Sequence, residues 1–285
     1  MIAPSLPSGV LGALDAPTPG ERIAIGAAGI PWSALCWGEP AARPLLLIHG
    51  VTSSAASWWR VGPALAASGR RVFAVDLPGH GRTGHWLGHH RFRDNAADVA
   101  AFAQTAGLAT DDLQVIGHSW GAMTAAALPV AGLRPATIVL LDPPAVPHAF
   151  ISAMAADADQ RTFDDLDEAR AAVRRGNPGW HDGDIEAKAE ALTQLDEAAA
   201  HSVVLDNGDW DGGLADLGDP AAAGIPVWVV RGDPTTGGYF PDSWLPAFEA
   251  RLGPGRIQTI RGGPHSPQRT HPLETTAALL AGLEA

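Results

Sequence analysis

One serine in this chain has neighbours that could make it a nucleophile. Ser119 is the middle residue of the sequence G-H-S-W-G at residues 117–121, which follows a largely apolar run (113–116) and precedes a helix-compatible stretch (122–128). A strand that turns sharply into a helix presents the residue at its tip, and the flanking glycines remove Cβ atoms that would clash there. The helix N-terminus favours negative charge that develops beside it. The pattern therefore indicates a nucleophilic serine, and a chance glycine–serine loop is the alternative.

A serine nucleophile needs a base that takes its proton. His265 is the candidate because it follows an expected strand and lies in a loop rich in glycine and proline, residues 262–267. Such a loop can turn tightly and place the imidazole at the edge of a sheet. The rival His271 precedes Pro272 at an expected helix start, where a histidine is typical of a cap or surface position.

Two further loops complete the pattern. A wholly apolar run at residues 44–48 ends in H-G-V-T at 49–52, and a second run at 71–75 ends in D-L-P-G-H-G at 76–81. Short apolar runs of this kind are typical of strands in a buried parallel sheet. Together with the G-H-S-x-G turn and the late histidine, these loops mean that the chain resembles the α/β-hydrolase fold family from about residue 21 to its end.

The order of apolar runs and helical stretches predicts an α/β fold. Strand and helix alternate, which is typical of a doubly wound, mostly parallel sheet, here with eight strands. The strands are expected at residues 22–25, 30–37, 44–49, 71–76, 112–118, 136–141, 226–231 and 256–261. The acidic, alanine-rich segment after the sixth strand lacks strand patterns, and the resemblance implies that it is an all-helical cap. We therefore expect an α/β-hydrolase core of residues 1–142 and 212–285 and a cap insertion of residues 143–211.

The resemblance also implies a carboxylate that orients His265. Asp233 follows the seventh strand, where the family usually carries its acid, and is our first choice. The commonest family pattern places the acid three residues after the glycine, but Thr235 stands there, so Asp233 requires a shorter loop. Asp142 follows the sixth strand, a position that some relatives use, and is the alternative acid.

The family pattern assigns the oxyanion hole to two backbone N–H groups, those of Val51 and Trp120. We expect Trp58, Trp59 and His118 to line the substrate pocket, although core packing is the alternative for the two tryptophans. Further aromatic candidates for the pocket are Trp120, Trp180 and Trp210.

The loop after the fourth strand contains two patterns that we interpret as structural. It matches G-x-G-x-x-G at residues 79–84, but no helix-compatible stretch follows directly, as a dinucleotide site would require. It also carries His80, His85, His89 and His90, yet the adjacent pair would point two ways on regular structure and a solvated loop explains the cluster more simply. We expect neither a cofactor nor a metal.

Composition narrows the range of partners. The 285 residues carry a net charge of −12, which disfavours nucleic acid and acidic membranes, and Cys36 is the only cysteine, so no internal disulfide can form. Four prolines among the first twenty residues predict a flexible arm and no signal peptide, and no apolar run is long enough for a membrane span. We therefore expect a cytoplasmic protein whose partner is a small molecule. The sequence leaves its oligomeric state open.

The expected reaction is hydrolysis of a carboxylic ester, on a small to medium uncharged substrate, through an acyl-enzyme. Ser119 argues against the relatives that form an alkyl ester on an aspartate, namely haloalkane dehalogenases and epoxide hydrolases. It does not separate an esterase from a lactonase, a carbon–carbon bond hydrolase or a perhydrolase, which can use the same triad. Hydroxynitrile lyases share the triad too, and Lys188, the only lysine, lies in the expected cap. A non-catalytic ligand receptor of the same fold is the alternative from another class.

Overall fold

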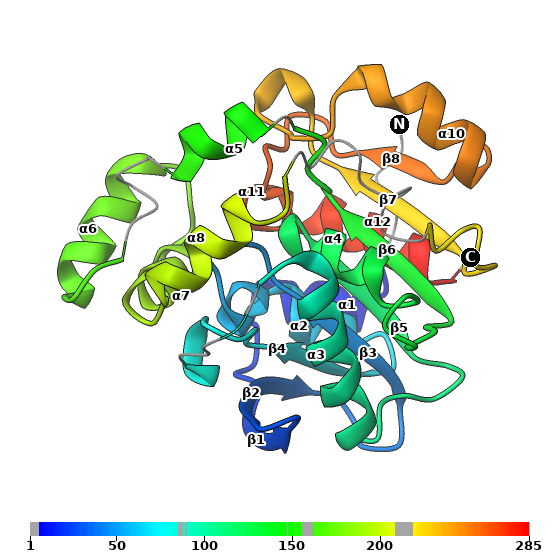
Figure 1. Cartoon of the computed structure of the whole chain (residues 1–285), viewed down its shortest axis with the longest axis horizontal. Coiled ribbons are helices and arrows are strands. Elements are labelled where there is room, and N and C mark those ends of the chain that lie inside the picture. The colour runs from blue at the N-terminus through cyan, green and yellow to red at the C-terminus, as the bar shows by residue number, and fades with distance from the viewer. Residues whose placement is uncertain are drawn as a thin grey trace.

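An eight-stranded sheet forms the centre of the protein (Figure 1). The computed structural model describes residues 6–84, 88, 90–146, 148–155, 162–208 and 219–284. The strands are β1 (Glu21–Ala27), β2 (Ile30–Trp37), β3 (Arg43–Ile48), β4 (Arg70–Val75), β5 (Gln114–His118), β6 (Thr137–Leu141), β7 (Val227–Arg231) and β8 (Ile257–Thr259). Their order is β1-β2-β4-β3-β5-β6-β7-β8, with β1–β2 and β2–β4 antiparallel and the other pairs parallel. The expected doubly wound, mostly parallel sheet is confirmed.

Side chains of the central strands alternate between two hydrophobic cores, because successive residues of a strand point to opposite faces. In β3, Leu46 and Ile48 join the core on one face, whereas Leu45 and Leu47 join the core on the other. All four side chains are fully buried. A continuous apolar run is what a parallel sheet that is covered on both faces requires.

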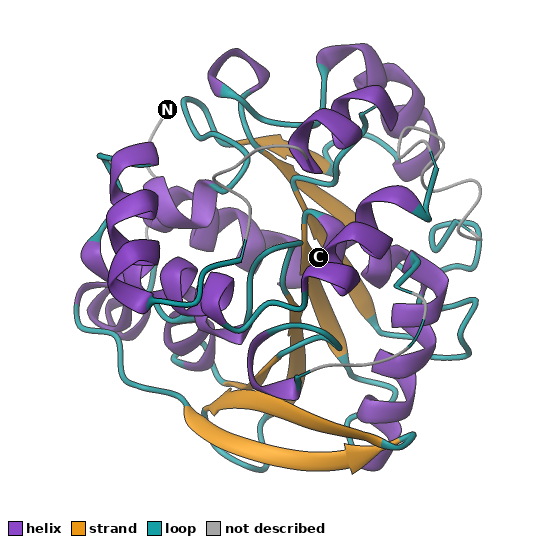
Figure 2. Ribbon diagram, turned by 60° about the vertical axis from the view of Figure 1, so that its left-hand side comes forward, coloured by secondary structure: helices purple, strands orange, loops and turns teal. Residues whose placement is uncertain are grey.

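Helices cover both faces of the sheet (Figure 2). Phe102 of α3 and Phe248 of α10 belong to the core on one face, which α4 also covers. Leu14 of α1, Leu65 of α2 and Leu279 of α12 belong to the core on the other face. The helices are α1 (Ser8–Asp15), α2 (Val61–Ala66), α3 (Phe92–Thr105), α4 (Trp120–Ala127), α10 (Leu245–Leu252), α11 (Pro267–Thr270) and α12 (Pro272–Glu284). None of the helices in the described ranges combines the length and the hydropathy needed to cross a bilayer.

Residues 8–15 form a helix, where the prolines predict a flexible arm. Helix α1 starts directly after Pro7. Val10 and Leu14, four residues apart on one side of this helix, are buried in the core that α2 and α12 share. A proline that immediately precedes a helix removes no hydrogen bond from it. The apolar pair therefore stabilises a helix here, which Pro7 precedes and Pro17 follows.

Four described helices lie between β6 and β7, in the segment expected to form the cap. They are α5 (His148–Ala155), α6 (Leu166–Gly176), α7 (Asp182–Thr193) and α8 (Glu197–Leu205), at the left of Figure 1. Phe163, Ile185 and Leu192 belong to a small hydrophobic core of this segment, separate from the two cores of the sheet. The expected boundary at residues 211 and 212 and the candidate Trp210 lie outside the described residues. The division of the chain into a core and a cap domain stays a prediction.

Candidate active site

Ser119 lies at the tip of the turn between β5 and α4. Its backbone adopts φ 54° and ψ −122°, a conformation that L-residues other than glycine rarely adopt. A Cβ at Gly117 would overlap the backbone carbonyl of Gly121, and a Cβ at Gly121 would overlap that of Ile48. Both glycines are therefore needed for helix α4 to approach the ends of β5 and β3 this closely. Strain of this kind costs about 1–3 kcal/mol and is typical of functional positions.

The structure brings the candidate nucleophile and the candidate base together. Oγ of Ser119 lies 2.7 Å from Nε2 of His265, and Nδ1 of the same ring lies 2.6 Å from Oδ2 of Asp142. In the neutral tautomer that fits both contacts, Nδ1–H donates to the carboxylate and the serine hydroxyl donates to Nε2. A hydroxyl, an imidazole and a carboxylate joined in this order form the arrangement that activates a serine oxygen.

Asp233, our first choice for the acid, does not lie beside His265, so this prediction is wrong. Its carboxylate turns back into its own loop, where Oδ1 accepts hydrogen bonds from the N–H and hydroxyl of Thr235 and Oδ2 accepts one from the N–H of Gly262. These hydrogen bonds lower the pKa of Asp233 to about 2. Asp233 caps a short 3₁₀ turn that starts immediately after it. Since a capping side chain must face the turn that it caps, it cannot also reach the imidazole of His265.

Asp142, the alternative acid, is the carboxylate beside His265. It follows β6, is fully buried and has φ 41°. Besides the ring of His265, Oδ1 accepts the N–H of Gly232 at 2.8 Å and Oδ2 accepts the N–H of Tyr239 at 2.9 Å. A buried carboxylate needs such donors to offset the loss of water. The two backbone donors come from either end of the loop after β7, so this loop holds the acid that β6 supplies.

Two aromatic side chains flank the ring of His265. The ring of Tyr239 stacks on it, with centroids 3.8 Å apart and planes inclined by 17°. On another side, Nε2–H of His118 donates to the backbone carbonyl of His265 at 2.9 Å. Burial, followed by the repulsion that a positive charge on His265 would add, holds the pKa of His118 well below its usual value, so His118 is neutral. These contacts fix the base from its ring face and from its backbone.

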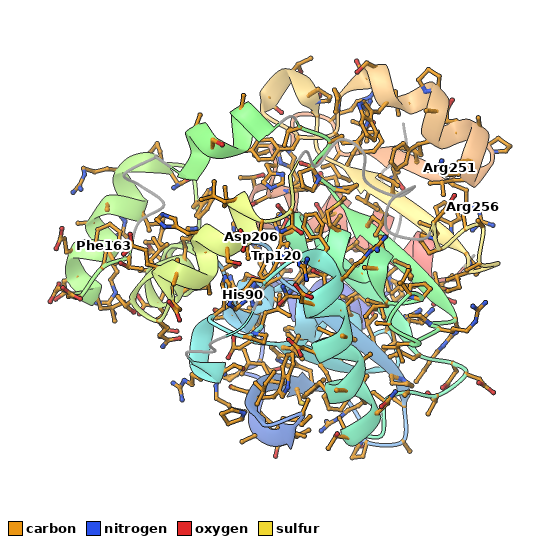
Figure 3. The ribbon with its side chains drawn as sticks, in the orientation of Figure 1. His90, Trp120, Phe163, Asp206, Arg251 and Arg256 are labelled. Atoms are coloured by element: carbon orange, nitrogen blue, oxygen red, sulfur yellow. The ribbon has the colours of Figure 1, made fainter. Side chains whose placement is uncertain are left out.

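The two expected oxyanion donors come from separate segments that lie beside Ser119. Trp120 is the first residue of α4, so its N–H has no acceptor within the helix. Val51 lines the same cavity as Ser119, in the loop after β3. A Cβ at Gly50 would lie 3.0 Å from Cβ of Ser119, which shows how closely this loop passes the serine. The side chain of Trp120 is itself fully buried, against the rings of His49 and His80 (Figure 3).

Ser119 and His265 open into a cavity of about 330 Å³. His118 lines it as expected, whereas Trp58 and Trp59 do not. Trp58 is fully buried in the core of the sheet, and the indole N–H of Trp59 donates to Oδ1 of Asp184 in α7 at 3.0 Å. The two expected pocket tryptophans therefore serve packing and docking. Of the further aromatic candidates in the described residues, Trp180 lines the cavity and Trp120 does not.

Sequence reasoning missed several side chains that border the cavity, among them Tyr239, Lys188 and Arg269. The ammonium of Lys188, in α7, donates to the backbone carbonyl of Thr52 at 2.8 Å and to its hydroxyl at 2.7 Å. Nη1 of Arg269, in α11, donates to the backbone carbonyl of Asp184 at 3.0 Å. Burial lowers the pKa of Arg269 and raises that of Asp184. Only the rarity of lysine in the chain singled out one of these residues.

The histidines of the loop after β4 that the structure describes, His80 and His90, are buried and not solvated as expected. Burial lowers the pKa of His80 to about 3, and its Nδ1–H donates to the carbonyl of Pro78 at 3.0 Å. His90 is buried beside the helices that lie between β6 and β7 (Figure 3). His85 and His89 lie outside the described residues. Among the residues that are described, no three histidine, cysteine or acidic side chains gather in a way that could hold a metal ion.

Comparisons with known proteins agree with this architecture. A family model described as alpha/beta hydrolase fold matches residues 43–227. The chain is 35% identical over 121 residues to a dihydrolipoyllysine-residue acetyltransferase component of an acetoin cleaving system from Pseudomonas putida, which covers 42% of this chain and 31% of that protein. It is 35% identical over 83 residues to epoxide hydrolase B of Mycobacterium tuberculosis, covering 28% and 23%, and 29% identical over 154 residues to a serine hydrolase-like protein of Danio rerio, covering 50% and 46%. The chain thus spans less than half the length of these curated relatives.

Solved structures share the fold over nearly the whole chain. The E-2-(acetamidomethylene)succinate hydrolase aligns with a TM-score of 0.79 at 20% identity and covers 93% of this chain and 100% of its own. The thioesterase domain from the curacin biosynthetic pathway aligns with a TM-score of 0.71 at 22% identity and covers 92% and 99%. At such identities the likeness concerns the fold alone. Together with the family match over more than half of its residues, it shows that the chain belongs to the α/β-hydrolase fold family.

Proposed function

We propose that this protein is a serine hydrolase that cleaves a carboxylic ester through an acyl-enzyme. The observation that carries the proposal is the hydrogen-bonded series from Ser119 through His265 to Asp142. Each group has the position that its role requires, since the hydroxyl faces the cavity, the imidazole lies between the two oxygens, and the carboxylate is buried behind the ring.

In the first half of the reaction, Oγ of Ser119 forms a bond to the carbonyl carbon of the ester while its proton passes to Nε2 of His265. The π electrons of the carbonyl move to its oxygen, which becomes an oxyanion. When this tetrahedral species collapses, the bond to the alcohol oxygen breaks, and His265 returns its proton to that oxygen. The alcohol leaves and the acyl group stays on Ser119.

In the second half, water takes the place of the alcohol. His265 removes a proton from the water while the water oxygen bonds to the acyl carbon. It then gives this proton to Oγ of Ser119 as the carboxylic acid leaves. Asp142 keeps the ring in the tautomer that presents Nε2 to the serine and stabilises the imidazolium that forms twice in the cycle. The backbone N–H groups of Val51 and Trp120 stabilise the oxyanion, a contribution worth about 3 kcal/mol for each donor.

The chemistry of the nucleophile supports an acyl transfer over the opening of an epoxide. An alkyl-enzyme ester that water can cleave at its carbonyl requires a carboxylate nucleophile. Ser119 is a hydroxyl on a turn that keeps it beside an imidazole base. The epoxide hydrolases among the relatives therefore share sequence with this chain but do not determine the reaction that we propose for it.

The dimensions and lining of the cavity favour a compact substrate. Its volume of about 330 Å³ lies at the lower end of the range for sites that bind small molecules. Val51, Ala172, Val173 and Trp180 give part of its wall an apolar character, and Asn177 adds a polar group. These features favour an ester with a short acyl chain.

Hydrolysis of p-nitrophenyl esters of increasing acyl length, by the wild type and by Ser119→Ala, tests the proposal. We expect turnover that is greatest for short chains and that falls by at least about 10³-fold in Ser119→Ala. Equal turnover by both proteins would contradict the proposal. Absence of turnover by the wild type on every ester, with saturable binding of the same esters, would support a ligand receptor instead.

A further inference from the structure

Helix α7 contacts the loop that carries the proposed oxyanion donor Val51 and helix α11, which follows the loop of His265. We infer that α7 positions the oxyanion loop (residues 50–53) through Lys188, so that docking of this helix and completion of the oxyanion hole are one event. The inference rests on the proposed function, because it concerns the hole that Val51 and Trp120 form beside Ser119. Lys188 is thereby a positioning residue, which acts through Thr52.

Thr52 is the residue of the oxyanion loop that Lys188 contacts. It follows Val51 directly and adopts φ 55°. For a β-branched residue such a left-handed conformation is a genuine outlier, which persists only where the surroundings hold it. The ammonium of Lys188 donates hydrogen bonds to both the carbonyl oxygen and the hydroxyl of Thr52, at 2.8 and 2.7 Å. Because one ammonium holds the backbone carbonyl and the side chain of Thr52 together, it restricts the path of the loop at this residue. The peptide that carries the N–H of Val51 is only the second peptide before the Cα of Thr52, so its orientation depends on that path.

Asp184, a second polar residue of α7, connects this helix to Trp59 and Arg269. Asp184 precedes Lys188 by one turn, so both side chains lie on the same side of the helix. Oδ1 of Asp184 accepts the indole N–H of Trp59, and its backbone carbonyl accepts Nη1 of Arg269. Trp59 follows the oxyanion loop, and Arg269 stands four residues after His265. One helix thus contacts the loop that carries the oxyanion donor and the helix that follows the loop of the base.

Helix α7 packs closely against Trp59. A Cβ at Gly183 would lie 2.5 Å from Cζ2 of Trp59, so the indole reaches the helix only because this residue is a glycine. The ring of His181, which caps the helix, lies 5.2 Å from that of Trp59. Such complementarity favours one docked position of α7 over several loose ones, which is what a positioning element requires.

The experiment compares the wild type with Lys188→Met in two assays of Ser119. The first is hydrolysis of p-nitrophenyl acetate, butyrate and hexanoate and of mono-p-nitrophenyl adipate. The second is the second-order rate of labelling by a fluorophosphonate, in which Ser119 attacks the phosphorus and displaces fluoride. This step also needs a polarised oxygen on the reagent but does not need ester turnover. We expect kcat and the labelling rate to fall by roughly 10- to 100-fold, less than the loss of a whole oxyanion donor, while KM changes by less than about threefold. Arg174→Gln, which removes an exposed cation of α6 that pairs with Asp182, is the charge-matched control and is expected to leave both rates unchanged.

Thr52→Val identifies the route of the effect. It removes the hydroxyl acceptor and keeps the shape of the side chain, so we expect a smaller loss, and a double variant with Lys188→Met that is no worse than Lys188→Met alone. If Lys188→Met does not fold, Lys188→Gln carries the same comparison. Because Lys188 is the only lysine, reductive methylation with ¹³C-formaldehyde gives one side-chain NMR signal, which we expect to shift on substitution of Thr52.

Three results would overturn the inference. Unchanged kcat and labelling in Lys188→Met would show that the oxyanion loop needs no support from α7. Full additivity with Thr52→Val would show that Lys188 does not act through Thr52. A loss confined to mono-p-nitrophenyl adipate, with p-nitrophenyl hexanoate unaffected, would make Lys188 a recognition residue for a substrate carboxylate. Labelling of the wild type without any ester turnover would refute the proposed ester substrate and leave the inference about α7 standing.

Discussion

Nδ1 of His265 lies 2.6 Å from Oδ2 of Asp142, although 123 positions separate the two residues in the chain. Asp142 comes from the end of β6 and not from the loop after β7, which holds the acid in the arrangement expected first. Since β6 pairs directly with β5, the strand before Ser119, the nucleophile and the acid leave neighbouring strands at the same edge of the sheet. Only the base comes from a distant part of the sequence.

The first prediction separates the two candidate acids. Asp142→Asn removes the negative charge and turns an amide toward donors, so we expect kcat to fall by roughly 10³- to 10⁴-fold. Asp233→Asn keeps a side chain that caps a turn equally well, and we expect kcat within about threefold of the wild type. Steady-state hydrolysis of a p-nitrophenyl ester measures both, with circular dichroism as a control for folding. A larger loss in Asp233→Asn than in Asp142→Asn would refute the assignment.

The second prediction concerns the ring that stacks on His265. Tyr239→Phe keeps the aromatic face at 3.8 Å, whereas Tyr239→Ala removes it and leaves the imidazole free to tilt. We expect the alanine variant to lose about tenfold in kcat and the phenylalanine variant to retain clearly more activity than the alanine variant, because orientation of the base matters more than binding here. Equal activity of the two variants would mean that the ring does not orient His265.

The third prediction tests the fit between α7 and Trp59. Gly183→Ala places a methyl group against the indole, and overpacking of this kind destabilises a protein by about 1–3 kcal/mol. Gly179→Ala is the matched control, since a Cβ at that position meets nothing within 4 Å. Thermal unfolding should show a lower Tm for Gly183→Ala only. We also expect reduced esterase activity in that variant, and equal Tm values in the two variants would contradict the described docking.

The fourth prediction is a loss of stability in acid. Burial lowers the pKa of His49 to about 4 and of His80 to about 3, from the ordinary value of 6.5. Below pH 6.5 the unfolded chain therefore binds protons that the native state does not bind, and the free energy of unfolding decreases as the pH falls toward 4, by on the order of 3 kcal/mol for His49. Burial raises the pKa of Asp98 to about 6, and this group opposes the trend.

Urea unfolding between pH 4 and pH 7 measures this slope. His80→Asn can still donate to the carbonyl of Pro78 and should flatten the dependence of stability on pH. Asp98→Asn should make the same dependence steeper, because it removes the opposing group. If both variants kept the slope of the wild type, the buried histidines would not be the source of acid sensitivity.

The sequence predicts the sheet and the turn at Ser119 because both follow from local patterns. An apolar run that is buried on both faces can be recognised from its own residues. The glycines at 117 and 121 indicate that α4 packs closely against the strands. The choice between Asp142 and Asp233 is different in kind. Both follow a strand, and the direction of each carboxylate depends on hydrogen bonds within the loop after β7, for which the sequence has no simple signature.

The lining of the cavity could not be predicted for a related reason. Trp58 and Trp59 are adjacent, yet one is fully buried in the core and the other reaches α7. Lys188 reaches the cavity only through the way in which the helices between β6 and β7 dock on the sheet, where α7 also meets Arg269 of α11, and no local pattern encodes this docking. The family resemblance gives the position of such a segment in the chain but not the residues that it contributes.

The loop from Asp233 to Gly238 is joined at both ends to the carboxylate of Asp142, through the N–H groups of Gly232 and Tyr239. Its middle is exposed, so it offers an accessible handle on a buried group. A short peptide epitope grafted into this loop would leave the serine and the cavity intact, and capture of the epitope by an antibody would pull on both anchors of the acid. The same loop could thus convert recognition of a partner into a change in turnover, which makes the protein a natural scaffold for an enzyme-based sensor.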